Sequence, residues 1–209
     1  MRILIFGATG GTGRQLVQQA LERNHSVTAF VRDPVKLAIQ HPLLQVFQGD
    51  IRRVDTIRAA IAGHEAVLSA LGIRSLRPNT LLSDAAQEIV RAMEAHAVRR
   101  LLWESSLGVG ETGGRLGPLY NWLLIPLLLR HVFADKERQE QILRSSSVDW
   151  TIVQPASLTN GPRTGTYRVG QRACAGRLFP RISRADVAHF MLEELTTRAH
   201  VRQTVAICH

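Results

Sequence analysis

The chain has 209 residues, of which 45% are hydrophobic and 21% are charged, a balance typical of a globular domain that excludes general disorder. Its 26 Lys and Arg residues against 17 Asp and Glu residues give a formal net charge of +9. No uninterrupted apolar run reaches about 18 residues, so the sequence predicts no membrane-spanning helix. The first residues, MRILIFGATGG, enter a glycine motif where a signal peptide would have its cleavage site, so we expect no secretory signal.

Arginine carries nearly all of the positive charge, because Lys36 and Lys136 are the only lysines in the sequence. Residues 151–209 hold 8 basic and 3 acidic side chains, and this difference of 5 positive charges is more than half of the net charge of +9. An anionic ligand or a nucleic acid would account for such a surplus. No helix-turn-helix and no interleaving of aromatic and basic residues supports nucleic acid, so we expect no such partner. One acid-free stretch contains Arg163, Arg168, Arg172, Arg177, Arg181 and Arg184.

Short apolar runs of strand length alternate with amphipathic stretches of helix length from the first residue onward. The alternation predicts consecutive βαβ units, and hence one doubly wound α/β domain over residues 1–209 with a parallel sheet of the Rossmann type. The runs predict strands at 2–6, 26–31, 44–48, 66–69, 99–104 and 149–154. Apolar residues three and four apart predict helices at 12–23, 53–62, 80–97 and 134–146.

The last part of the chain is less regular. Ser183 and Asp186 have the spacing of a capping box, so a helix is expected to begin near 183, and a final strand is expected at about 203–208. Two segments break the βαβ rhythm and are interpreted as insertions on the substrate side: 107–133 and 157–182. The apolar run 119–129 is compatible with a substrate lid, a dimer contact, a helix at a membrane surface, or a helix buried against its own domain.

A glycine-rich turn, Gly7-Ala8-Thr9-Gly10-Gly11-Thr12-Gly13, lies between the first predicted strand and the first predicted helix. Glycines at such a place permit a tight turn and a close approach of the backbone to a pyrophosphate. The following helix N-terminus offers free N–H groups to the phosphates. In this context the motif indicates a dinucleotide site rather than a plain turn.

The end of the second predicted strand favours NADP(H) over NAD(H). An NAD site has an Asp or Glu there that binds the ribose 2′-hydroxyl. This sequence has Arg32 instead, followed by Asp33 and, soon after, Lys36. Arg32 and Lys36 suit a 2′-phosphate, with Asp33 turned to solvent, although Arg32 is also compatible with a solvated turn charge.

The third and fourth predicted strands end in further candidate cofactor residues. Asp50 can accept a hydrogen bond from the adenine amino group or can cap the following helix. In this topology the carboxyl ends of the first, fourth and fifth strands line the crevice. Leu71 and Gly72 are therefore expected beneath the ribose and the nicotinamide.

Six motifs in this order resemble the atypical short-chain dehydrogenase/reductases over nearly the whole chain: GATGGTGR, VRDPVKL, GDI, LGIRS, the serine pair after the fifth strand, and ISRADVAHFML. The most similar group is the NADPH-dependent flavin reductase/biliverdin-IX-beta reductase family. The resemblance implies NADP(H) as the cofactor and a flavin or a linear tetrapyrrole as the small-molecule acceptor of hydride. A monomer or a weak homodimer is expected.

The resemblance also implies roles for individual residues. Ser106 corresponds to a serine beside the nicotinamide, and Lys136 resembles a lysine that faces the nicotinamide ribose, so both are candidate catalytic residues. The alternatives are small turn residues for the serine pair and a solvated helix charge for Lys136. Matching motifs imply that the cofactor contacts Gly7, Thr9, Gly10, Gly11, Thr12, Arg32, Lys36, Asp50, Ile51, Leu71, Gly72, Ser105 and Pro155.

Two departures from the family pattern weaken the expectation of catalysis. Ser157 stands where mammalian-type reductases have a histidine, and Val132 stands where a Tyr-x-x-x-Lys motif would place its tyrosine. Because the cofactor itself supplies the hydride, reduction remains possible without these residues. A protein that binds NADP(H) without turnover, as a redox sensor or an assembly factor, is the alternative. The acceptor is expected to contact Ser157, Arg163, Arg168 and Arg172.

Histidines and cysteines predict neither a metal site nor a disulfide. No pair of histidines has metal-ligand spacing, so we expect no metal. Cys174 and Cys208 are far apart and lack CxxC spacing, which fits a reducing compartment and favours a cytoplasmic location.

Overall fold

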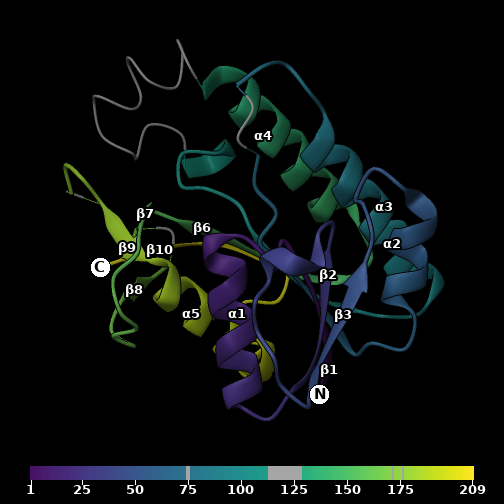
Figure 1. Cartoon of the computed structure of the whole chain (residues 1–209). Helices are drawn as coiled ribbons and strands as arrows, with labels where there is room; N and C mark the ends of the chain where they lie inside the picture. The colour runs from purple at the N-terminus through teal and green to yellow at the C-terminus, as the bar shows by residue number, and fades with distance from the viewer. Residues whose placement is uncertain (74–75, 113–128, 171, 176) are drawn as a thin grey trace.

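The central sheet organises the whole structure. The computed structural model describes residues 1–73, 76–112, 129–170, 172–175 and 177–209. Within this part of the chain, eight strands form one sheet in the order β3-β2-β1-β4-β5-β6-β10-β8, flanked by helices (Figure 1). All neighbouring strands are parallel except β8, which is antiparallel to β10 at one edge. This architecture confirms the doubly wound α/β class.

The strand bounds follow the apolar runs closely. The principal strands are β1 (Arg2–Phe6), β2 (Ser26–Val31), β3 (Leu44–Gln48), β4 (Ala66–Ser69), β5 (Arg100–Glu104), β6 (Asp149–Pro155) and β10 (Gln203–Cys208). Three very short strands were not predicted from the sequence: β7 (Ser157–Thr159), β8 (Arg168–Val169) and β9 (Arg181–Ser183). β7 and β9 pair with each other in a second, two-stranded sheet.

The helices also agree with the sequence pattern, with shifts of one to four residues at their ends. They are α1 (Gly11–Glu22), α2 (Val54–Ile61), α3 (Leu81–Ala95), α4 (Arg130–Ser145) and α5 (Arg184–Thr197), with short 3₁₀ turns η1 (Pro34–Lys36) and η2 (Gly110–Thr112). Helix α4 begins four residues before the predicted start at 134. Of the insertion predicted at 107–133, residues 113–128 lie outside the described part of the chain, and so does most of the apolar run 119–129.

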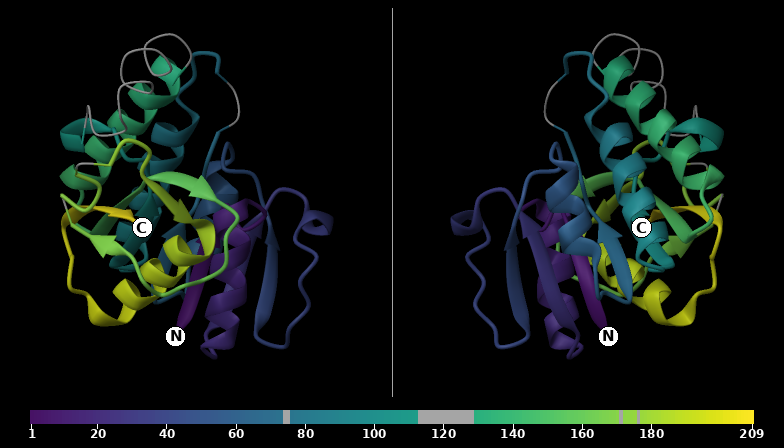
Figure 2. Two further views of the ribbon diagram at one scale, coloured as in Figure 1. Left: turned by 90° about the vertical axis from the view of Figure 1, so that its left-hand side faces the viewer. Right: turned by 90° about the vertical axis from the view of Figure 1, so that its right-hand side faces the viewer.

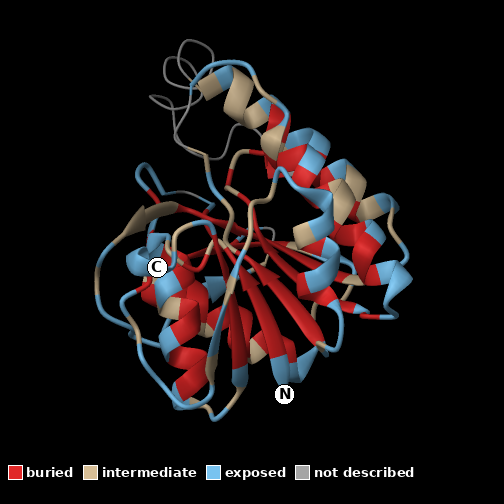
Figure 3. Ribbon diagram, turned by 45° about the vertical axis from the view of Figure 1, so that its right-hand side comes forward, coloured by how far each residue is buried: buried red, intermediate tan, exposed pale blue. Residues whose placement is uncertain are grey.

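Side chains alternate across the sheet and create a core on each face. Ile3 and Ile5 of β1 pack with α1 and α5, whereas Leu4 and Phe6 pack with α2, α3 and α4. Figure 2 shows the two helical layers from opposite sides, and Figure 3 shows the buried strands between them. Burial on both faces is why these strands read as continuous apolar runs rather than as alternating ones.

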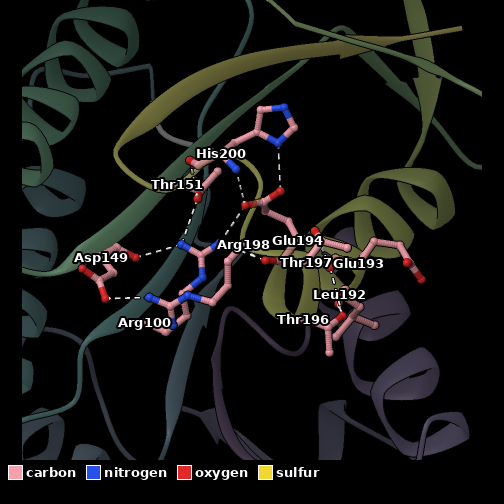
Figure 4. Close-up of polar contacts among 10 residues, drawn as sticks. All are labelled: Arg100, Asp149, Thr151, Leu192, Glu193, Glu194, Thr196, Thr197, Arg198 and His200. Atoms are coloured by element: carbon pink, nitrogen blue, oxygen red, sulfur yellow. Dashed lines mark hydrogen bonds and ion pairs between the residues drawn. The ribbon is translucent and has the colours of Figure 1, made fainter.

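A buried charge network ties β5 and β6 to α5. The Arg100 guanidinium lies 3.1 Å from Glu194 Oε1, and these side chains are only 3% and 1% exposed. Arg100 also donates to Thr151 Oγ1 at 2.9 Å and to the Asp149 carbonyl at 2.8 Å, while Glu194 accepts from the His200 ring at 2.8 Å (Figure 4). The network lies at the amino end of β5, so it fixes the strand whose other end reaches the candidate site.

Within the described residues, no helix combines the length and apolarity needed to cross a bilayer.

Candidate cofactor and active site

The turn between β1 and α1 has the shape that its glycines permit. Gly7 has a φ of +76°, and a Cβ atom there would lie 2.4 Å from the Ala70 carbonyl oxygen at the end of β4. A Cβ atom on Gly13 would lie 2.0 Å from the Gly7 carbonyl oxygen, so α1 approaches the turn too closely for any side chain. Both glycines are therefore required for the path of the backbone.

The N-terminus of α1 is open to an anion. Gly10 is the N-cap, and no side chain caps the helix. The first turn of α1 also contains no acidic residue. Free N–H groups and the positive end of the helix dipole therefore face the space beyond the turn, which is the arrangement that binds phosphate.

A cavity of about 670 Å³ extends from this turn along the carboxyl ends of β1, β2, β3 and β4. It brings together most of the predicted cofactor residues, from segments that are up to 65 residues apart in the sequence, as with Gly7 and Gly72. Its lining includes Gly7, Thr9, Gly10, Arg32, Lys36, Asp50, Ile51, Leu71 and Gly72. The position between β1 and β4 is the point where the strand order reverses, which is where ligands bind in such sheets.

Three basic side chains gather at the β2 end of this cavity. Arg32 and Lys36 are exposed and line it, and Arg14, which the sequence analysis did not single out, lines it as well. Arg14 is fixed there by hydrogen bonds to the Lys36 carbonyl at 2.6 Å and to the Thr9 carbonyl at 3.2 Å. Asp33 caps η1 and pairs with Lys36 at 3.3 Å, so it is a turn residue rather than a ligand for a ribose.

Asp50 lies in the cavity wall and does not cap α2. Its carboxylate accepts a hydrogen bond from the Arg52 N–H at 3.0 Å, while the N-cap of α2 is Arg53, with no side-chain capping bond. Of the two roles that the sequence left open, capping of the helix is therefore wrong. Within the described residues, the second Asp50 carboxylate oxygen accepts no hydrogen bond from the protein, which leaves it available to a donor in the cavity.

The residues predicted beside the nicotinamide follow the ends of β5 and β6. Ser105 is buried, and its hydroxyl donates to Glu140 Oε1 at 2.5 Å, so it is committed to a protein partner. Ser106 is half-buried and makes only a long bond, 3.3 Å, to the Leu107 carbonyl. Pro155 ends β6 and is buried. Ser106 is thus the freer of the two hydroxyls.

A buried acid at the end of β5 connects the glycine turn to α4. Glu104 Oε1 accepts a hydrogen bond from Thr12 Oγ1 at 3.0 Å, and both residues are buried. Lys136 on α4 is half-buried, and its charge acts on Glu104, Glu140 and Asp135. Lys136 is therefore not a solvated helix charge, which was the alternative for this residue.

Burial brings the charged and neutral forms of these groups closer in free energy. It raises the pKa of the Glu104 carboxyl, an effect that the charge of Lys136 and the Thr12 hydroxyl partly oppose. It also lowers the pKa of the Lys136 amine, against the opposing effects of Glu104, Glu140 and Asp135. The Lys136 Nζ can therefore release a proton more readily than an exposed lysine.

Glu140 extends the network away from the cavity. Besides Ser105, it accepts from Gln154 Nε2 at 2.8 Å and from Arg144 at 2.9 Å. Burial raises the pKa of the Glu140 carboxyl. Sequence reasoning missed Glu104, Glu140 and Gln154; the one signal was a carboxylate ending the fifth strand directly after the apolar residues Leu101, Leu102 and Trp103.

Of the four residues predicted to contact the acceptor, three lie beyond the carboxyl ends of β6 and β10, and Arg163 lies elsewhere. Ser157 begins β7, directly after β6, and Arg168 lies on β8, exposed, opposite Cys208 at the carboxyl end of β10. Arg172 is exposed on the following turn. Arg163 pairs with Glu22 at 3.0 Å, in the last turn of α1. Because an α-helix rises about 1.5 Å per residue, Glu22 lies roughly 16 Å along α1 from the glycine turn, and we leave its partner Arg163 out of the acceptor site.

The residues present fit a dinucleotide. The open N-terminus of α1 suits a pyrophosphate, and the basic side chains at the β2 end of the cavity suit a further phosphate. Asp50, which has one carboxylate oxygen available to a donor, also lines this cavity.

Comparison with known proteins agrees with this fit. Residues 7–198 match the NAD(P)H-binding family. An uncharacterized chloroplast protein of Arabidopsis thaliana is 30% identical over 175 residues, which are 78% of this chain and 61% of that protein. The photosystem II assembly factor Ycf39 of Synechocystis is 26% identical over 165 residues, which are 77% of this chain and 46% of that protein. This chain thus spans about half to three fifths of the length of these two relatives.

Among solved structures, the anaerobilin reductase ChuY from Escherichia coli O157:H7 is similar over the full length. It has a TM-score of 0.82 and 25% sequence identity, and the match covers 100% of this chain and 97% of that chain.

Proposed function

The chain belongs to the NAD(P)H-binding family, with NADP(H) as its cofactor, and from this premise we propose that it is an NADPH-dependent reductase whose acceptor is a flavin or a linear tetrapyrrole. The observation that carries the proposal is the cavity at the carboxyl ends of β1 to β4 together with the glycine turn beside it. Basic side chains suited to a 2′-phosphate lie at one end of the cavity, and Thr12 of the turn donates to the buried Glu104, on which the charge of Lys136 acts.

The proposed preference for NADPH rests on the residues at the β2 end. Arg32 takes the place of the acid that would bind a ribose 2′-hydroxyl, and no carboxylate replaces it, because Asp33 is held by η1 and Lys36. Arg32, Lys36 and Arg14 together supply the positive field that a 2′-phosphate needs.

NADPH supplies the hydride when it is bound, so the protein has to position the reactants and manage a proton. Ser106 is the hydroxyl placed to orient a carboxamide or an acceptor group, since its own bond within the protein is long. Lys136 holds a proton at Nζ that its lowered pKa makes available. The charge of Lys136 acts on Glu104, whose carboxylate accepts a hydrogen bond from Thr12 of the glycine turn.

The acceptor class is supported by two considerations. The sequence resembles flavin and bilin reductases, and the similar Escherichia coli structure is described as an anaerobilin reductase. Ser157, Arg168 and Arg172 lie beyond the end of β6 on the exposed side, where arginines could pair with phosphate or propionate groups.

A second candidate function is NADP(H) binding without turnover, in the assembly or sensing of other components. The similarity to a photosystem II assembly factor favours it, as does the absence of a Tyr-x-x-x-Lys motif. Here Glu104 and Lys136 would serve only to stabilise the bound dinucleotide.

Steady-state oxidation of NADPH by the purified protein, with a panel of free flavins and bilins, separates the two candidates. The proposal expects turnover with at least one acceptor and a higher kcat/KM for NADPH than for NADH. Tight NADPH binding with no turnover on any acceptor would support the second candidate instead.

A further inference from the structure

Arg184, which the proposed site has not used, lies directly over the start of α1. It is the first residue of α5, and its side chain crosses Gly11. A Cβ atom built on Gly11 would lie 2.5 Å from Arg184 Cδ and 2.6 Å from Arg184 Nε. The glycine at position 11 thus leaves the space that the arginine side chain occupies.

The arginine is held in this place by its own part of the fold. Its Nη1 donates to Asn160 Oδ1 at 2.7 Å, and the side chain is half-buried. The segment after Asn160 is anchored by Asp186, which accepts from the Thr164 and Gly165 N–H groups, each at 2.8 Å. A guanidinium positioned in this way loses little conformational freedom when it binds an anion.

The charges around Arg184 favour the binding of an anion. Within the described part of the chain it forms no ion pair with a carboxylate, and the end of α1 that it covers is itself the positive end of a helix dipole. Burial raises the pKa of the Glu104 carboxyl and the charge of Arg184 only partly opposes this effect; that carboxyl is bonded to Thr12. Two positive groups, the Arg184 guanidinium and the N-terminus of α1, therefore lie side by side, and within the described residues no carboxylate is paired with the guanidinium.

We propose that Arg184 binds the pyrophosphate of NADP(H), closing over the glycine turn from α5. This proposal rests on the dinucleotide site and not on reductase turnover. The guanidinium can donate two parallel hydrogen bonds to phosphate oxygens, while the α1 N–H groups bind the same anion from the opposite side. Gly11 and Arg184 form a matched pair, because a side chain at position 11 would displace the arginine.

The binding test uses ligands that carry one phosphate group or the other. We expect Arg184→Ala to weaken NADPH binding by about tenfold or more, the usual size of a charge-assisted hydrogen bond. The affinity for adenosine 2′-monophosphate, which lacks the pyrophosphate, should be unchanged, and Arg184→Lys should lose less. Arg32→Ala should weaken both ligands, and Arg181→Ala, an exposed arginine on β9, should weaken neither.

Two results would overturn the proposal: an Arg184→Ala affinity for NADPH within twofold of wild type, or an equal loss for both ligands, which would indicate damage to the fold. Failure of the proposed reductase activity would leave these affinities intact, so the two failures are distinguishable.

A double-mutant cycle tests the matched pair. Gly11→Ala should weaken NADPH binding in the wild-type chain by displacing Arg184, and it should cost little more in the Arg184→Ala background. Fully additive losses would show that the two residues act separately and would contradict the coupling.

Discussion

At the scale of single residues, the choice of cofactor depends on position 32. Arg32 is exposed at the end of β2 and lines the cavity beside Lys36 and Arg14. An acid at this place in the fold would bind a ribose 2′-hydroxyl, whereas a guanidinium attracts a phosphate. One side chain therefore carries much of the expected discrimination between the two dinucleotides.

Arg32→Glu should reverse that discrimination. We expect NADPH affinity to fall about tenfold to a hundredfold, because a charge-assisted contact is lost and a like charge is introduced, while NADH affinity is kept or improved. Titration of both dinucleotides followed by nicotinamide fluorescence measures the change. Arg58→Ala, an exposed arginine of α2 outside the cavity, is the matched control. Equal losses for both dinucleotides would contradict the assignment.

Lys136 and Glu104 predict a pH dependence with a definite sign. If the ammonium form of Lys136 is the active one, the reductase rate falls as pH rises through its lowered pKa. Because the Glu104 carboxylate raises that pKa, Glu104→Gln should move the alkaline limb to lower pH. Lys136→Met should lower kcat by about a hundredfold or more.

The pH profile of kcat for Glu104→Gln tests this account. The control is Glu137→Gln, because Glu137 is an exposed acid on α4, the helix that carries Lys136, and its replacement should leave the profile unchanged. An unchanged alkaline limb in Glu104→Gln would mean that Glu104 does not act through Lys136.

At the scale of elements, β5 is positioned by a buried ion pair at one end and delivers Glu104 at the other. Arg100 and Glu194 are almost fully buried, and Arg100 also bonds to β6. Burying two charges is costly, so the pair fixes the geometry more than it adds net stability. Removing one partner leaves the other charge buried and unpaired.

Arg100→Ala should therefore lower the free energy of unfolding by about 3–5 kcal/mol. Its neighbour Arg99, which is 67% exposed and pairs with Asp149 at 3.4 Å, provides the control. Arg99→Ala should cost less than about 1 kcal/mol. Urea unfolding followed by circular dichroism measures both; similar losses in the two variants would contradict the role given to the buried pair.

The helices and the longer strands were predictable from the sequence, because each has a recognisable pattern of apolar residues. The short strands, which exist only through backbone pairing with a neighbouring strand, were not. β1 to β4 lie within the predicted ranges because each is an apolar run of strand length between turn residues. β7, β8 and β9 have two or three residues each and carry no periodicity. The capped start of α5 was predictable from the spacing of Ser183 and Asp186. In the structure, Ser183 Oγ accepts a hydrogen bond from the Asp186 N–H at 2.9 Å.

The candidate site divides in the same way. The glycine turn and Arg32 were predictable from the sequence, because their roles depend on the few residues that directly follow a strand. The approach of Glu104 to Thr12, and that of Arg184 to Gly11, join segments far apart in the chain, so only the tertiary structure reveals them. Arg163 was assigned to the acceptor because it belongs to the acid-free arginine stretch expected on the substrate side, and in the structure it pairs with Glu22 in the last turn of α1.

At the scale of the whole molecule, the net charge of +9 is distributed with a pattern. Arg14, Arg32 and Lys36 gather at one end of the cavity, and Arg184 covers the glycine turn. Other arginines, such as Arg100 and Arg144, neutralise buried acids within the fold. One group of basic residues thus surrounds the candidate cofactor site, while other exposed arginines, such as Arg58 on α2 and Arg168 on β8, lie outside the cavity.

Anaerobic single-turnover mixing tests the central claim most directly. Protein loaded with NADPH is mixed with flavin mononucleotide or with a bilin, and the absorbance of reduced nicotinamide and the spectrum of the acceptor are followed together. The reductase account predicts loss of one reduced nicotinamide for each acceptor reduced, at a rate that Lys136→Met slows. Bound NADPH that stays reduced in the presence of every flavin and bilin tested would contradict it.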